Sequence, residues 1–286
     1  MSMASSAAPL ATEKWFDSST VAVVTGANKG IGYDIARLLC EQGITTVVTA
    51  RNAELGRRAI DTLSRSPASV GKLDFHQLDV SDKASVDMFA EWLRQNHGGL
   101  NILVNNAGIA FKGSSFSAGE AQATLDTNLY GTANMCEAMK PLMREGARIV
   151  NVSSMAGKTS IIRDPKLRQE FVGASSKEEV FALARRFVTG IQSNNHQAGG
   201  WPNTMYGVSK LCESTYTRVL ADELKSKGVL VAACCPGYCA TDMSSWGGSK
   251  TAAEGADTPV WLALTAPRDC AATTGRYWTG RQNLPW

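Results

Sequence analysis

The sequence contains no apolar run that approaches the roughly 20 residues a helix needs to cross a bilayer, so we expect no membrane partner. It also contains no run of five or more Lys and Arg residues, and its formal net charge is only +3, so we expect no nucleic acid partner either. What is present is a chain of 286 residues, 44% hydrophobic and 19% charged, which is enough to bury one large globular core.

The cysteines lack the spacing of a metal site or a disulfide framework. Their number is odd, no two of them stand in a Cys-x-x-Cys motif, and several lie in apolar stretches. We therefore expect reduced cysteines, no bound metal and a cytoplasmic protein. The seven residues are Cys40, Cys136, Cys212, Cys234, Cys235, Cys239 and Cys270.

The first twenty residues lack the apolar segment of a signal peptide. They are rich in Ser and Ala but contain Glu13, Lys14 and Asp17, whereas transit peptides are rich in Arg and poor in acidic residues. We therefore expect residues 1–19 to form a flexible tail and residues 20–286 to form a single domain.

Short β-rich runs alternate with longer helical patterns along most of the chain. The runs are apolar throughout, as expected for a parallel sheet covered by helices on both faces. Right-handed crossovers then predict an α/β fold: a doubly wound parallel sheet of the Rossmann type, with about seven strands in the order 3-2-1-4-5-6-7. The predicted strands are 21–24, 46–49, 73–77, 101–104, 148–152 and 229–233, with a seventh near 276–278, and the predicted helices are 31–41, 54–65, 83–96 and 124–143.

Residues 155–205 interrupt this alternation. The segment carries many charged side chains, followed by a helical pattern over 180–191, and it has too few apolar residues to build a core of its own. We expect a helical insertion within the domain.

A glycine-rich turn follows the first predicted strand and runs into a helix. It reads Thr25-Gly-Ala-Asn-Lys-Gly-Ile-Gly32, with glycines in a GxxxGxG spacing. Glycine permits a tight turn and a close approach of the backbone, so amides at the helix start can meet a phosphate group. The strand before it and the helix after it favour nucleotide binding over an ordinary glycine-rich turn.

Basic residues stand where the adenosine ribose of a dinucleotide is expected. The second strand ends at Arg51, whose planar guanidinium suits a 2′-phosphate, whereas an acidic residue there would suit the free hydroxyl of NAD. Lys29, inside the glycine turn, supplies a second cation. The pattern favours NADP(H); the alternative is that both side chains are ordinary solvated surface charges.

Tyr206 and Lys210 stand four positions apart at the start of a predicted helix and so share one face. A nearby ammonium stabilises the phenolate and makes the hydroxyl a better proton donor, which carbonyl reduction requires. The hydroxyl of Ser154, at the end of the fifth predicted strand, suits stabilisation of the negative charge that grows on a carbonyl oxygen. Because a Tyr-x-x-x-Lys pair alone is more often an ordinary surface pair, this assignment depends on the motifs around it.

Together these motifs resemble, in order and over nearly the whole chain, the short-chain dehydrogenase/reductase family. Within it, the insertion before Tyr206, the Trp201-Pro202 pair and a C-terminal Trp286 are similar to the monomeric carbonyl reductases and to the plant menthone and salutaridine reductases. The motifs that carry the resemblance are Thr25–Gly32, Asn105-Asn-Ala-Gly108, Asn128, Asn151-Val-Ser-Ser154, Tyr206-x-x-x-Lys210 and Pro236-Gly237.

The resemblance implies four catalytic residues. Tyr206 would be the general acid, Lys210 would bind the nicotinamide ribose, Ser154 would orient the substrate, and Asn128 would complete a proton relay through water. Ser154 is preferred to Ser153 because adjacent side chains of a strand point in opposite directions. Asn128 fits equally well as a polar residue that satisfies a helix kink.

The resemblance also implies which residues surround the ligands. Those expected at the substrate are Ser154, Met155 and Tyr238, and Tyr238 replaces the Trp or Phe that is frequent in relatives. Those expected at the cofactor are Gly26, Asn28, Lys29, Gly30, Ile31, Gly32, Arg51, Asp79, Val80, Asn106, Tyr206, Lys210, Pro236, Gly237, Cys239 and Thr241.

The implied activity is NADPH-dependent reduction of a small-molecule carbonyl compound, a ketone, aldehyde or quinone. One alternative is an NADP-dependent alcohol dehydrogenase of terpenoid or alkaloid metabolism, and another is a nucleotide-binding scaffold without catalysis. Family members dimerise largely through the helices that carry Asn128 and Tyr206. We expect the insertion to cover this surface and the protein to be a monomer.

Overall fold

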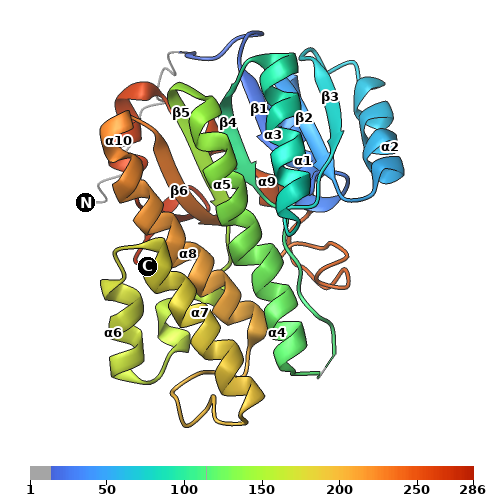
Figure 1. Ribbon diagram of the computed structural model, residues 1–286. Helices are drawn as coiled ribbons and strands as arrows, with labels where there is room; N and C mark the ends of the chain where they lie inside the picture. Colours follow the sequence, from blue (N-terminus) through green and yellow to red (C-terminus); the bar gives the residue numbers. More distant parts are fainter. Residues whose placement is uncertain (1–13, 114) are drawn as a thin grey trace, which may run out of the picture.

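The protein is built around one sheet of eight strands, flanked by helices (Figure 1). The computed structural model describes residues 14–113 and 115–286. The strand order is β3-β2-β1-β4-β5-β6-β7-β8, parallel except for the last pair, which confirms the predicted fold class and strand order. The strands are β1 (Val21–Val24), β2 (Thr45–Ala50), β3 (Leu73–Gln77), β4 (Leu100–Asn105), β5 (Met143–Val152), β6 (Leu230–Cys235), β7 (Tyr277–Thr279) and β8 (Gln282–Leu284).

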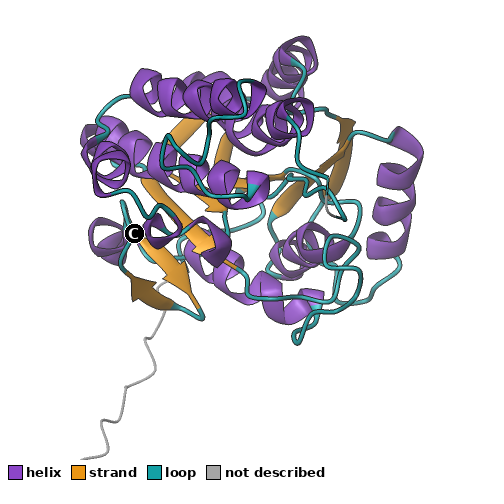
Figure 2. Cartoon of the chain, turned by 90° about the horizontal axis from the view of Figure 1, so that it is seen from below, coloured by secondary structure: helices purple, strands orange, loops and turns teal. Residues whose placement is uncertain are grey.

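Alternate side chains of the central strands enter two different cores. In β1, Val21 and Val23 join one apolar cluster, while Ala22 and Val24 join another on the opposite face. Successive side chains of a strand point to opposite faces, so this alternation is expected for a strand that is buried on both faces of the sheet. Figure 2 shows the strands between two layers of helices. One layer comprises α1 (Gly30–Glu41), α2 (Ala53–Ser64) and α9 (Ala252–Ala263), and the other comprises α3 (Lys83–His97), α4 (Ala118–Leu125), α5 (Thr132–Met139) and α8 (Met205–Leu224).

Two predicted boundaries were wrong. The helix predicted over 124–143 is divided by a π-helical turn, Asp126–Gly131, and it ends before β5, which begins at Met143 and not at residue 148. The turn packs against Val80 so closely that a Cβ at Gly131 would lie 2.8 Å from a methyl carbon of that residue. Strand β8 was not predicted, because three residues are too few to show an alternating pattern.

The insertion forms helices that pack against α8. They are α6 (Pro165–Gly173) and α7 (Lys177–Gln192), drawn in yellow beside α8 in Figure 1. Asp164 caps α6 ahead of Pro165, and Ser176 with Glu179 forms a capping box at the start of α7. Apolar residues of both helices join the core cluster that includes α8. The insertion therefore shares the apolar cluster of α8.

The segment expected to be a tail lies partly outside the described residues, since residues 1–13 are not described. Its remaining part, 14–19, makes specific contacts with the domain. The indole nitrogen of Trp15 donates a hydrogen bond to the carbonyl oxygen of Leu264 at 3.2 Å, and the guanidinium of Arg148 lies 3.6 Å from the centre of one Trp15 ring. Over 14–19 the chain is thus anchored to the domain.

Within residues 14–113 and 115–286, no helix has both the length and the apolar character required for a membrane span. All seven cysteines fall within these residues, and none is in a disulfide.

Candidate active site

The glycine turn between β1 and α1 has the backbone that its sequence requires. Gly26 and Gly30 have φ values of +62° and +59°, in the left-handed region that favours glycine. A Cβ at Gly32 would lie 2.3 Å from Nδ2 of Asn106. In the described part of the chain, the N-cap residue of α1, Lys29, makes no side-chain cap hydrogen bond, whereas Asn52 caps α2 and Asp82 caps α3. A helix start without a capping side chain fits a phosphate-binding turn.

Asn106 holds this turn from inside. Its side-chain amide donates to the carbonyl oxygens of Thr25 at 2.9 Å and Gly26 at 3.1 Å, and its own backbone N–H donates to the Thr25 hydroxyl at 3.0 Å. Sequence reasoning placed Asn106 beside the adenosine ribose and missed this clamp. Two consecutive asparagines after a strand do not indicate which carbonyl oxygens will accept hydrogen bonds from the side chain of the second.

The residues expected around the adenosine lie at the ends of β2 and β3. Arg51 follows β2 and is exposed, and its guanidinium forms no ion pair within residues 14–113 and 115–286. Asp79 follows β3, and its carboxylate accepts from the backbone N–H and hydroxyl of Ser81 at 3.0 and 2.6 Å. Val80 is buried, packed against the π-helical turn. The unpaired cation of Arg51 fits a 2′-phosphate.

The loop after β6 lies across the glycine turn. A Cβ at Gly30 would lie 3.5 Å from a methyl carbon of Thr241, and the ammonium of Lys29 pairs with the carboxylate of Asp242. Lys29 was predicted to provide a second cation for the phosphate; its ammonium reaches the loop of Thr241. Gly237 has a φ of +92°, so the chain turns sharply after Pro236.

Lys210 ties the helix α8 to the end of β5. Its Nζ donates to the carbonyl oxygen of Val152 at 2.8 Å and to Oε2 of Glu213 at 2.7 Å. Tyr206 stands one helical turn earlier on α8. Burial acts to lower the pKa of Lys210, but the negative charge of Glu213 and the hydrogen bond to it outweigh burial, and the pKa is raised. The ammonium is therefore kept in its charged form.

The adjacent serines that follow β5 have different surroundings. Ser153 is buried, and its hydroxyl shares a 2.8 Å hydrogen bond with the hydroxyl of Ser214. Ser154 is half-buried, and its oxygen accepts from the backbone N–H of Ala156 at 3.2 Å. The hydroxyl hydrogen of Ser154 remains available to a carbonyl oxygen.

Two glycines allow the turn after Ser154 to touch α8. A Cβ at Gly157 would lie 2.5 Å from the carbonyl carbon of Lys210, and a Cβ at Gly207 would lie 2.9 Å from the carbonyl oxygen of Ala156. Both distances are too short for any side chain. Ser154 is thereby held beside the part of α8 that carries Tyr206 and Lys210.

Asn128 lies in the π-helical turn and joins it to two other elements. Its Oδ1 accepts from the backbone N–H of Ile109 at 2.8 Å, and its Nδ2 donates to the carbonyl oxygen of Ile109 and to the hydroxyl of Ser209, both at 2.9 Å. A Cβ at Gly108 would lie 3.2 Å from Oδ1 of Asn128 and 3.6 Å from Nζ of Lys210. Asn128 and Lys210 thus meet at Gly108, and the helix kink considered for Asn128 is present.

A cleft of about 550 Å³ opens beside Tyr206. Phe111 and Phe116 line it from the loop after β4, and His196 and Asn203 line it from the insertion. The phenyl ring of Phe116 packs against the imidazole of His196, with 4.9 Å between ring centres. Sequence reasoning missed these lining residues, because loop positions without a motif give no sign that they converge on a helix far along the chain.

The residues predicted at the substrate lie elsewhere around the site. Met155 packs against a small cluster formed by Ala233, Cys235 and Tyr277. Tyr238 is 61% exposed, on the loop after β6. Neither residue lines the cleft beside Tyr206, so the cleft and the predicted residues border different parts of the site.

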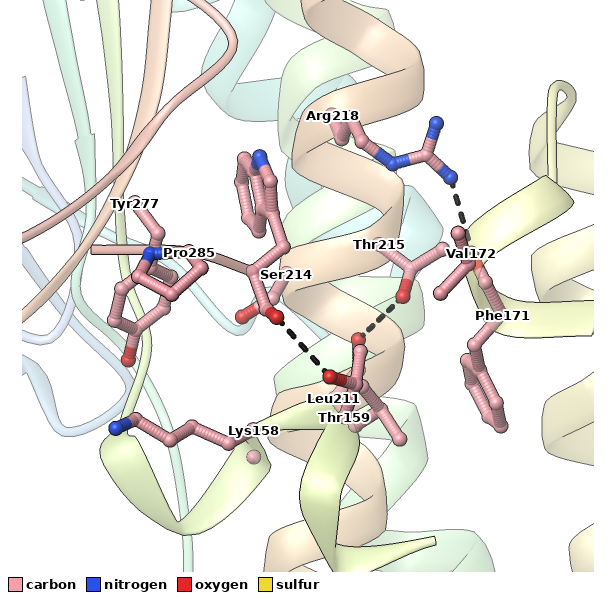
Figure 3. Close-up of a pocket in the computed structure, with 12 residues that line it drawn as sticks. Lys158, Thr159, Phe171, Val172, Leu211, Ser214, Thr215, Arg218, Tyr277 and Pro285 are labelled. Carbon is pink, nitrogen blue, oxygen red and sulfur yellow. Dashed lines mark hydrogen bonds between the residues drawn. The ribbon is translucent and has the colours of Figure 1, made fainter. Parts of the chain in front are cut away.

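A second, smaller cavity of about 120 Å³ lies against another face of α8 (Figure 3). Leu211, Thr215 and Arg218 line it from α8, together with Phe171 of α6 and Trp286 near the end of the chain. Arg218 is held by hydrogen bonds to the carbonyl oxygens of Phe171 and Ala174. None of the predicted site residues lines this cavity, so it is separate from the candidate active site.

A family model described as short chain dehydrogenase matches residues 20–166 and 188–250. The chain belongs to the short-chain dehydrogenase family. The unmatched stretch between the two segments falls in the insertion. The family predicted from the motifs is thereby confirmed.

The relatives cover nearly the whole chain. Carbonyl reductase (NADPH) 3 of Mus musculus is 43% identical over 258 residues, 87% of this chain and 92% of the mouse protein. Carbonyl reductase (NADPH) 1 of Homo sapiens is 38% identical over 275 residues, 93% of this chain and 98% of the human protein. Among solved structures, salutaridine reductase from Papaver somniferum has a TM-score of 0.83 at 29% identity, covering 91% of this chain and 99% of its own. The menthone neomenthol reductase from Mentha piperita has a TM-score of 0.78 at 27% identity, covering 90% and 97%.

Proposed function

We propose that this protein reduces a ketone, aldehyde or quinone to the corresponding alcohol or hydroquinone, with NADPH as the reductant and Tyr206 as the proton donor. The prediction of an NADPH-dependent oxidoreductase of this family is confirmed by the family match and by the two carbonyl reductases. The substrate class and the roles of the individual residues are the proposal.

One observation carries the proposal: the ammonium of Lys210 is fixed at the end of β5, one helical turn from Tyr206. A cation held there stabilises the phenolate that remains after proton donation. The glycine turn, the uncapped start of α1 and the unpaired Arg51 supply a cradle for a dinucleotide phosphate on the same side of the sheet.

When bound, NADPH supplies the hydride that reaches the carbonyl carbon. As negative charge grows on the carbonyl oxygen, the hydroxyl of Ser154 donates a hydrogen bond to it and Tyr206 transfers its phenolic proton. Lys210 would hold the nicotinamide ribose, and its ammonium stabilises the resulting phenolate. Asn128 holds the loop after β4 against α8, and a water relay from Lys210 past Asn128 returns the proton.

The cleft beside Tyr206 supports a substrate with a flat apolar part. Phe111 and Phe116 present aromatic surfaces, and the paired side chains of His196 and Asn203 add a polar end. A quinone or an aromatic ketone fits this combination. Met155 and Tyr238 remain proposed substrate residues, although neither lines this cleft.

The insertion supports the proposal of a monomer. Its helices α6 and α7 pack on α8 and α4, and so cover the helices through which the resemblance to the wider family implies that dimers form. Sedimentation of the purified protein tests this proposal directly. A stable dimer would contradict it.

The proposed activity is tested by following NADPH absorbance with menadione, isatin and menthone. We expect turnover with at least one of them in the wild-type protein. Tyr206→Phe is expected to lose at least a hundredfold in kcat while NADPH still binds, because the phenol is the proton donor. Equal rates in the two proteins would refute the role of Tyr206.

A further inference from the structure

A carboxylate is buried behind the catalytic lysine. Glu213 follows Lys210 by three positions on α8 and has no exposed surface, and its Oε2 lies 2.7 Å from Nζ of Lys210. Glutamate is almost never fully buried unless it is paired. The motifs that identify the site extend from Tyr206 to Lys210 and do not include this residue, and the proposed chemistry does not use it.

The pairing leaves Glu213 incompletely satisfied. Its other oxygen, Oε1, has no hydrogen-bond partner among the residues that the structure describes. Burial raises the pKa of Glu213 to about 7, although the positive charge of Lys210 acts to lower it. The carboxyl group therefore changes its charge near neutral pH, directly beside the ammonium that faces Tyr206.

The other groups around Glu213 keep their protons near pH 7 and so stay uncharged. Cys234 faces it from β6, and burial raises the pKa of that thiol well above its ordinary value. Tyr277 faces it from β7, and burial raises the pKa of that phenol as well. Ser153, at the end of β5, and Thr132, on α5, approach with hydroxyl groups that act to lower the pKa of Glu213, but burial outweighs them. Among these neighbours, only the Lys210–Glu213 pair carries charge near pH 7.

We propose that Glu213 is a positioning residue of the reduction: its carboxylate fixes the ammonium of Lys210 and sets the net charge that Tyr206 experiences. The inference rests on the proposed function, because it assigns Lys210 to the reaction. With Glu213 ionised the pair is neutral overall, and with Glu213 protonated the pair carries one positive charge. The neutral pair stabilises the Tyr206 phenolate less and holds Lys210 more firmly away from the ribose.

Two consequences follow for the wild-type protein. First, kcat for carbonyl reduction falls as the pH rises through about 7, because proton donation by Tyr206 then leaves a less stabilised phenolate. Second, NADPH binds more weakly over the same range, because the ionised carboxylate competes for the ammonium of Lys210. Both changes, in kcat and in NADPH affinity, should follow the same ionisation, that of Glu213.

The test compares wild type with Glu213→Gln, which keeps the size and an acceptor oxygen but cannot ionise. We expect the step near pH 7 to disappear from the profiles of kcat and of the NADPH dissociation constant, while KM for the carbonyl substrate changes less than threefold. Glu213→Asp is expected to restore a step, because it restores an ionising group. Glu223→Gln is the matched control on the same helix: Glu223 is exposed and pairs with Lys140, so its profiles should match wild type.

The NADPH dissociation constant is measured by fluorescence and needs no turnover, so the two proposals fail separately. If the wild-type protein reduces none of the carbonyl compounds but its binding step is absent from Glu213→Gln, the proposed substrate class is wrong and the positioning role stands. If both steps persist unchanged in Glu213→Gln, Glu213 does not set the charge at Lys210 and the inference is overturned.

Discussion

Gly157 lies against the backbone of Lys210, so closely that a Cβ on the glycine would approach the lysine carbonyl carbon to 2.5 Å. This contact sets the spacing between the turn that follows Ser154 and the helix that carries Tyr206. It links a glycine outside the family motifs to the geometry of catalysis.

Gly157→Ala is therefore expected to disturb both stability and activity. The added methyl group forces α8 and the turn apart, at a cost of about 1–3 kcal/mol in the free energy of unfolding. We expect kcat to fall at least tenfold, because Ser154 moves relative to Tyr206. Denaturant unfolding and NADPH oxidation measure the two effects. Gly119→Ala in α4 is the control, since a Cβ there meets no atom within 4 Å. If both variants lost the same stability, the close contact between Gly157 and Lys210 would not explain the loss.

Arg51→Asp is expected to change the cofactor preference. The substitution removes a cation suited to a 2′-phosphate and adds a carboxylate suited to a ribose hydroxyl. Loss of a charge-assisted interaction worth about 1.5–3 kcal/mol predicts an NADPH affinity weaker by about 10- to 150-fold, with NADH favoured in comparison. Binding is followed by fluorescence titration. Arg57→Asp controls for the change in net charge, because Arg57 is an exposed arginine on α2. If Arg51→Asp kept the wild-type preference for NADPH over NADH, Arg51 would not bind the 2′-phosphate.

Phe111→Ala is expected to affect the carbonyl substrate and not the cofactor. The phenyl group lines the cleft beside Tyr206, and losing it removes about 1–2 kcal/mol of apolar contact with a flat substrate. KM for menadione should rise about 5- to 30-fold, with the NADPH dissociation constant unchanged. Val172→Ala, at the separate cavity on α8, should leave both constants alone. A rise in the NADPH dissociation constant of Phe111→Ala would place the cofactor, rather than the substrate, in this cleft.

Glu213 should make the wild-type protein more stable in mild acid than at neutral pH, relative to Glu213→Gln. Its pKa is about 7 in the folded chain against an ordinary 4.5, so the folded state binds the proton more tightly than the unfolded state. The resulting stability is complete below pH 4.5 and is lost as the pH rises through about 7. The difference between the two proteins should change by on the order of 3 kcal/mol across that window. Parallel pH profiles of unfolding free energy would show that Glu213 does not titrate there.

The central features of the fold follow from the sequence because they depend on local patterns. The apolar runs, with right-handed crossovers, predict the order of the first seven strands, and the glycine turn is found between β1 and α1 as its sequence indicates. Strand β8 and the π-helical turn at Asn128 do not follow, since the first is very short and the second depends on how Gly131 packs against Val80. Both are decided by tertiary contacts.

The same division holds for the site. The period of a strand predicts different surroundings for Ser153 and Ser154, and in the structure the first contacts Ser214 while the second accepts from Ala156. The cleft residues Phe111 and His196 do not follow, because they converge only after the insertion has folded over α8. The sequence does not single out Glu213 for a different reason. A glutamate three positions after a lysine on a helix ordinarily forms a surface ion pair with that lysine, and only the burial of Glu213 distinguishes it from such a residue.

The insertion packs on α8 and also supplies His196 and Asn203 to the cleft. A change in this segment that admits a bulkier reactant therefore also alters the surface that covers α8. Redesign of the cleft through the insertion should be followed by measurements of both reactant selectivity and self-association.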